Sequence, residues 1–116
     1  MTQEDKNLLL IDLCARLPYG VKYQDRIEGG IHILSLGTIR HYERFIPFIR
    51  PMSSMTDEEK NQWFDIINHY NKEGNPILTS IESIDWLNAN HFDYRELIEK
   101  GLALEAPKDM YNTKTE

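Results

Sequence analysis

The chain has 116 residues, of which 41% are hydrophobic and 28% are charged, so it can build one hydrophobic core, and its composition argues against wholesale disorder. The net charge of -6 is uneven, because residues 1–55 carry seven Lys+Arg and six Asp+Glu while residues 56–116 carry six and thirteen. No run approaches the ~20 apolar residues that a membrane span needs, and the apolar run at residues 8–11 is too short for a signal peptide.

The first residues predict a helix that ends near Pro18. Thr2 is a candidate N-cap, and acidic residues follow it in the first turn, where they suit the helix dipole. The expected packing stripe has the spacing i, i+3, i+4, i+7 and consists of Leu10, Leu13, Cys14 and Leu17.

Three strands are predicted next, at residues 19–24, 31–36 and 40–50. A turn at Gly29-Gly30 separates the first two. The second strand is apolar on both faces, which favours a central position. Pro47 and Pro51 limit the donors of the third strand, so we expect it to lie at an edge or to be interrupted.

Two or three helices follow. Thr56 with Glu59 forms a capping-box pattern, and Thr79 with Glu82 repeats it. Gly74, Asn75 and Pro76 predict the end of the first of these helices, and Asp93 with Glu96 predicts a short last one. The polar residues from 108 onward are expected to fray.

The predicted fold class is α+β, with an N-terminal helix, a small three-stranded antiparallel sheet and two to three C-terminal helices packed on it. We expect one globular domain over residues 1–107 and a flexible tail over 108–116. The expected core consists of Leu10, Leu13, Leu17, Val21, Ile33, Trp63, Ile67, Ile84, Leu87 and Leu97.

A cluster of functional side-chain types lies between the last two predicted helices. Aromatic residues and arginine are frequent anchors of protein interfaces, so this cluster is a candidate binding surface. The same residues also have structural explanations as helix caps and core residues. As a metal site the cluster is incomplete, because His91 and Asp93 supply two possible ligands whereas a zinc site needs three or four from the protein. The candidate binding residues are Trp86, His91, Tyr94 and Arg95.

A second candidate surface interleaves basic and aromatic residues along residues 40–50. Nucleic-acid platforms have this composition, because aromatic rings stack on bases and arginines hold phosphates. A strand with one apolar and one charged face produces the same pattern, and Glu43 interrupts it. The alternative nucleic-acid face consists of Arg40, Tyr42, Arg44 and Arg50.

Three blocks of sequence, at residues 12–22, 49–60 and 84–107, carry a resemblance. They begin with Asp12-Leu13-Cys14, Ile49-Arg50-Pro51 and Ile84-Asp85-Trp86. They resemble a group of small proteins from gut anaerobic bacteria and their phages or mobile elements, a group with no established function. The resemblance implies a cytoplasmic accessory protein carried by a mobile element, and it transfers no site residues.

The sequence has no phosphate loop, dinucleotide-binding glycine motif, nucleophile elbow or zinc-binding helix motif. We therefore expect a non-enzymatic protein-interaction module with no cofactor, no metal and no catalytic residue. Its expected partner is another protein, with nucleic acid as the alternative and no membrane. The single cysteine, which cannot form an internal disulfide, favours the cytoplasm.

Overall fold

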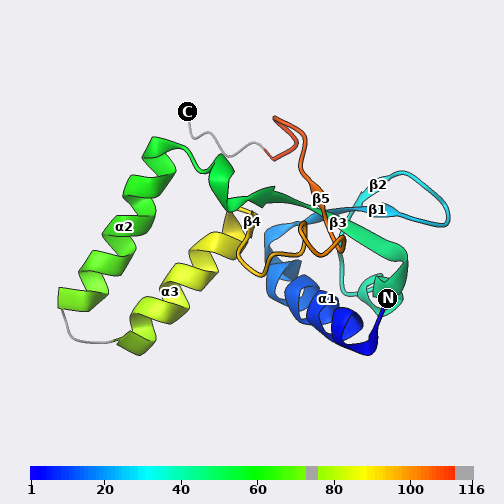
Figure 1. The fold of residues 1–116 in the computed structure, drawn as a ribbon, viewed down its shortest axis with the longest axis horizontal. Helices are drawn as coiled ribbons and strands as arrows, with labels where there is room; N and C mark the ends of the chain where they lie inside the picture. The colour runs from blue at the N-terminus through cyan, green and yellow to red at the C-terminus, as the bar shows by residue number, and fades with distance from the viewer. Residues whose placement is uncertain (73–75, 112–116) are drawn as a thin grey trace.

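The computed structural model describes residues 1–72 and 76–111, which form an α+β fold (Figure 1). The helices are α1 (Gln3–Arg16), η1 (Leu17–Tyr19), η2 (Ile39–Arg44), η3 (Met52–Ser54), α2 (Asp57–Lys72) and α3 (Pro76–Ala89), of which the three η elements are 3₁₀ helices. The strands are β1 (Lys22–Asp25), β2 (Ile31–Ile33), β3 (Phe45–Pro51), β4 (Phe92–Asp93) and β5 (Leu104–Glu105). No helix in the described part of the chain is long and apolar enough to cross a membrane.

Helix α1 begins as predicted and faces the core with a different stripe. Thr2 is the N-cap, and its side chain accepts a hydrogen bond from the backbone N–H of Asp5. The buried side chains are those of Leu9, Asp12, Leu13 and Arg16. Cys14 is exposed, so the predicted stripe was wrong by a rotation of the helix. In this orientation Asp12 and Arg16 are both buried, and they form an ion pair with each other.

The sheet is mixed, with the order β2-β1-β3-β4 and with β5 also paired to β3. Strand β1 pairs antiparallel with β2 and with β3, as the sequence predicted for three strands. The short strands β4 and β5 pair parallel to β3, so the sheet differs from the predicted three-stranded antiparallel one. Parallel partners need a crossover connection, and here the long segment containing the α2–α3 pair supplies it before β4.

Strand β2 is an edge strand, and all three of its residues are exposed. The predicted central position was wrong because apolar side chains on both faces do not determine how many strands pair with the segment. The turn before β2 is as predicted, since Gly29 and Gly30 have positive φ angles of 75° and 82°. Asp25 closes this turn by accepting from the N–H groups of Ile27 and Glu28.

Residues 40–50, predicted as one strand, form most of η2 and most of β3. Strand β3 is the centre of the sheet rather than an edge. The N–H of Arg26 bonds to the carbonyl of Arg44, and in an antiparallel ladder hydrogen-bonded pairs alternate with non-bonded pairs. Pro47 lies opposite Tyr23 in a non-bonded pair, so its missing N–H costs the β1–β3 ladder nothing.

Helices α2 and α3 form a pair, here called the helical hairpin, that lies beside the sheet rather than on it (Figure 1). The predicted Thr56–Glu59 capping box is confirmed by reciprocal hydrogen bonds. Helix α3 begins at Pro76, before the predicted start at Thr79, because proline is favoured in the first turn. The predicted helix end at residues 74–76 falls mostly outside the described residues, as does the side chain of Thr79.

The short last helix predicted from Asp93 does not form. The carboxylate of Asp93 accepts from the N–H groups of Leu97 and Ile98, as a cap does. Glu96 then adopts a φ of 62°, which breaks the helical path. The result is a capped turn between β4 and β5.

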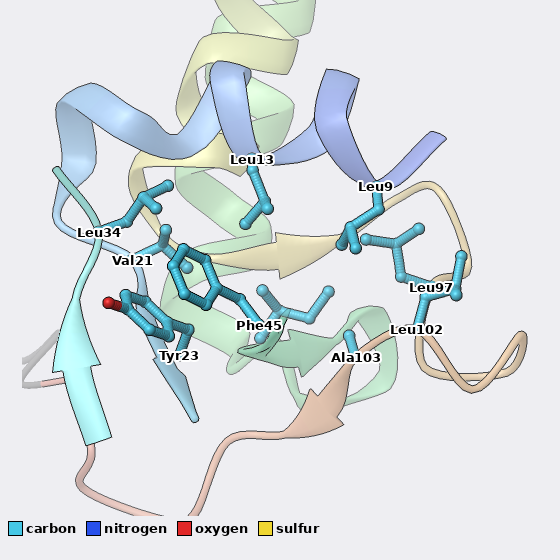
Figure 2. Packing of buried hydrophobic residues seen from close by; sticks show 10 residues of the cluster. Leu9, Leu13, Val21, Tyr23, Leu34, Phe45, Leu97, Leu102 and Ala103 are labelled. Carbon is cyan, nitrogen blue, oxygen red and sulfur yellow. The ribbon is translucent and has the colours of Figure 1, made fainter. Parts of the chain in front are cut away.

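The main core lies between α1 and the sheet. Figure 2 shows Leu9 and Leu13 reaching from α1 toward Phe45 and Leu97. A second cluster of Met55, Leu87 and Phe92 lies at the base of the helical hairpin. The predicted core residues Leu13, Val21, Leu87 and Leu97 are buried, whereas Ile33 and Ile84 are exposed.

The C-terminal segment continues the sheet through a side chain. Beyond the pair Tyr23–Pro47, the next partners would be Lys22 and Phe48. The hydroxyl of Tyr111 lies between them, accepting from the N–H of Lys22 at 2.8 Å and donating to the carbonyl of Phe48 at 2.6 Å. Part of the predicted tail therefore contacts the sheet, while residues 112–116 lie outside the described residues.

Replacing Tyr111 with Phe should leave these two backbone groups without their partner. We expect Tyr111→Phe to lower the free energy of unfolding by about 1–3 kcal/mol, measured by urea unfolding. Tyr19→Phe is the matched control, because the exposed Tyr19 hydroxyl has no hydrogen bond among the described residues. Equal stability of the two variants would show that Tyr111 does not bridge the strands.

Candidate functional site

A fully buried ion pair lies under the predicted binding cluster. Nε and Nη2 of Arg16 donate to the two carboxylate oxygens of Asp12 at 2.7 and 3.2 Å. Both side chains have no exposed surface. Nη2 of Arg16 also donates to the carbonyl of Phe92 at 2.6 Å. The i, i+4 pair on α1 therefore fixes the position of β4, which is far away in the sequence.

Arg95 and Tyr94 extend this network. Nη1 of Arg95 donates to the same Asp12 carboxylate at 3.0 Å. The guanidinium groups of Arg16 and Arg95 lie 5.5 and 4.8 Å from the centre of the Tyr94 ring, within cation–π range. The Tyr94 hydroxyl donates to Oδ1 of Asn88. The Tyr94 hydroxyl and one nitrogen of Arg95 are thus used in internal contacts.

Trp86 belongs to a stack on the ring of Phe92 in β4. Its ring stacks on Phe92 with centroids 5.7 Å apart, and the guanidinium of Arg50 lies 4.2 Å from the Phe92 ring centre. Arg50 also binds Glu59 through two hydrogen bonds of 2.7 Å. Burial raises the pKa of Glu59, but the hydrogen bonds from Arg50 and Thr56 outweigh it and leave the pKa below its usual value. This ion pair fixes the start of α2 to β3.

His91 is buried, with 7% of its surface exposed, and its ring stacks on Tyr111 with centroids 3.7 Å apart. Its φ of 65° is left-handed, and Nδ1 has no hydrogen-bond partner among the described residues. Burial lowers the pKa of His91 to about 4, helped by the positive charges of Arg16, Arg50 and Lys22. Burial also raises the pKa of Tyr111 to about 12, so both rings are neutral near pH 7.

The structure therefore brings the four predicted binding residues into one region and uses them to hold it together. Within residues 1–72 and 76–111, no group of three or more His, Cys, Asp or Glu could hold a metal ion. The cluster resembles a structural junction between α1, β3 and β4 more than an open binding site.

The alternative nucleic-acid face is divided between two elements. Nη2 of Arg44 donates to Asp25 at 2.9 Å and lies 3.6 Å from Glu28, and Arg50 is paired with Glu59. Hydrogen bonds from the N–H groups of Glu28 and Ile27, with the charge of Arg44, hold the pKa of Asp25 below its usual value. Tyr42 packs against the main core. Of the three arginines in this face, Arg40 is the one without a carboxylate partner among the described residues.

The helical hairpin exposes apolar side chains whose exposure the sequence did not predict. Phe64 on α2 is 52% exposed, and Ile81 and Ile84 on α3 are 50% and 41% exposed. Sequence periodicity assigns such residues to a core, because it shows which side chains share a face and not whether that face is covered. We call Phe64, Ile81 and Ile84 the outer face of the helical hairpin.

Helical geometry places these three side chains on one side. The indole N–H of Trp63 donates to Oγ of Ser83 at 2.6 Å, so these two positions mark the line where the helices face each other. Phe64 comes one residue after Trp63, and Ile84 comes one residue after Ser83. Each side chain is therefore rotated by about 100° around its helix axis from the line of contact. Helices joined by a short connection run antiparallel, so the same rotation turns both residues to the same side. Ile81 lies one turn from Ile84.

A cavity of about 600 Å³ lies between η3 and the C-terminal segment. Arg50 and Lys108 contribute positive charge to its lining, and Glu105 and Asp109 contribute negative charge. The arginine is already bound to Glu59. The lining therefore favours neither an anion nor a cation.

Comparison of the chain with protein-family models, curated proteins and solved structures finds no match. Its function therefore has to be inferred from the geometry described above.

The low pKa of His91 predicts a pH-dependent stability. The unfolded chain binds more protons than the folded chain between about pH 4 and about pH 6.5, so stability is complete above that window and is lost as the pH falls through it. From about pH 7.5 to about pH 5, we expect the free energy of unfolding in urea to fall by about 2 kcal/mol more in the wild type than in His91→Asn. Asparagine does not titrate and tolerates positive φ. The same pH dependence in both proteins would contradict this assignment.

Proposed function

We propose that the protein is a non-enzymatic interaction module that binds another protein through the outer face of the helical hairpin. The observation that carries this proposal is the exposure of Phe64, Ile81 and Ile84 on one side of two helices. Single exposed apolar residues are ordinary, but a group on one face is typical of an interaction site.

The charges around this face support a protein partner rather than nucleic acid. Residues 57–89 contain seven Asp+Glu and two Lys, a net charge of -5. Phosphates would be repelled by this surface. The arginines of the alternative nucleic-acid face are mostly paired with carboxylates, which lowers their capacity to bind phosphate.

The residues first predicted to bind are better assigned to stability. Arg95 is bound to Asp12, Tyr94 to Asn88, and Trp86 and His91 are stacked on Phe92 and Tyr111. A partner that used these groups would first have to break those contacts. An accessory role in the cytoplasm, with an origin in a phage or mobile element, remains part of the proposal on the strength of the resemblance alone.

The proposal is tested by substitutions that keep the fold and remove apolar surface. Ile81→Ser on α3 is matched by Ile11→Ser on α1, where the side chain is 56% exposed and also helical. We expect tagged Ile81→Ser to capture at least tenfold less of a specific protein from nuclease-treated host lysate than the wild type does, while Ile11→Ser captures as much. Circular dichroism checks that both variants are folded.

Two results would contradict the proposal. Equal capture by the two variants would place the binding surface elsewhere. If everything captured by the wild type disappears after nuclease treatment, the nucleic-acid alternative is favoured instead.

A further inference from the structure

A second exposed apolar surface lies on the β1–β2 hairpin and the loop after it. It consists of Ile27, Ile31, Ile33 and Leu36, which are 73%, 54%, 60% and 80% exposed, and is here called the β2 patch. Strand β2 pairs only with β1 and has no charged residue or proline on its free edge. Edge strands are usually protected by such residues, so this edge is unusually open to a partner.

The unpaired charges near the two apolar surfaces have opposite signs. In residues 22–44, Asp25 and Glu28 share a single ion-pair partner, Arg44, and Glu43 pairs with Lys6. Arg26 and Arg40 have no such partner among the described residues, which leaves positive charge beside the β2 patch. On the described part of the helical hairpin, the charged side chains without an ion-pair partner are Asp57, Glu58, Lys60, Asp65, Glu82 and Asp85.

The two surfaces also lie at opposite ends of the molecule. The helical hairpin occupies one end of the longest axis, whose extent is 48 Å, and the β1–β2 hairpin occupies the other (Figure 1). They cannot cover each other within one chain. They can do so between two chains.

We infer that the occupant of the β2 patch is a second copy of this chain, whose helical hairpin docks there through its outer face. The inference rests on the proposed function, because it uses the same outer face and names its partner. Contact between two copies of the acidic helical hairpin would be opposed by like charge, and so would contact between two basic β2 patches. Only the head-to-tail contact joins apolar to apolar surface with opposite charges around it.

A head-to-tail contact leaves one free surface at each end of a pair. Such heterologous contacts extend into filaments or close into rings, rather than stopping at a two-fold dimer. Because exposed charges contribute, the association should weaken as salt is added.

The test mixes two variants that each lack one surface. Ile31→Thr with Ile33→Thr removes the two isoleucines that strand β2 contributes to the β2 patch and keeps β-branched residues on the strand. Ile81→Ser with Ile84→Ser removes the two isoleucines that α3 contributes to the outer face of the helical hairpin. Sedimentation velocity measures the mass of each purified full-length protein from about 1 μM to about 1 mM, a range that covers weak association. Ile11→Ser is the control for a general loss of apolar surface.

We expect the wild type and Ile11→Ser to grow beyond a dimer with concentration, and each double variant alone to stay monomeric. An equimolar mixture of the two double variants should form a one-to-one complex and nothing larger, because only one intact pair of surfaces is available. A mixture that stays monomeric would overturn the inference, and so would a wild type that stays monomeric. If lysate capture still depends on Ile81 in that case, the proposed function stands with a different partner.

Discussion

The buried ion pair of Asp12 and Arg16 connects the parts of this fold that are distant in sequence. It joins α1 to β4 through the Phe92 carbonyl and to the following turn through Arg95. Charges without access to water are tolerated only where partners and hydrogen bonds offset their desolvation. Here one carboxylate serves two guanidinium groups, and the Tyr94 ring lies within reach of both. The arrangement explains why a region rich in functional residue types is closed.

A second ion pair performs a similar task at the helical hairpin. Arg50 on β3 binds Glu59, which also caps α2, and its guanidinium lies over Phe92. The two networks meet at β4, so the hairpin and α1 are both fixed relative to the sheet. The helical hairpin itself has no third layer on its outer face, and its apolar residues there are exposed. The ion pairs therefore fix the parts of the molecule relative to one another, and the outer face of the helical hairpin is the surface that we propose binds a partner.

Local chemistry made parts of the fold predictable from the sequence. The Thr2 cap, the Thr56–Glu59 capping box and the Gly29-Gly30 turn depend on neighbouring residues alone, and all three are present. The edge position of β2 and the turn after Asp93 were not predictable, because each depends on long-range pairing or on one left-handed residue. Trp86, His91, Tyr94 and Arg95, which are close in the sequence, also lie in one region of the structure. The sequence could not show that Asp12, about 80 residues earlier, takes up the charge of Arg95, and it assigned Ile84 to the core because periodicity does not reveal an uncovered face.

The central claim is that the Asp12–Arg16 pair holds the cluster around β4 in place, and a double-mutant cycle tests it most directly. The free energies of unfolding of Asp12→Leu, Arg16→Met and the double variant would be compared with the wild type. We expect Asp12→Leu to cost about 3–5 kcal/mol, because it leaves the buried Arg16 without an ion-pair partner. Arg16→Met should cost less, because Arg95 still pairs with Asp12, and the double variant should cost clearly less than the sum of the two. Single changes that each cost under about 0.5 kcal/mol, or costs that simply add, would contradict the account.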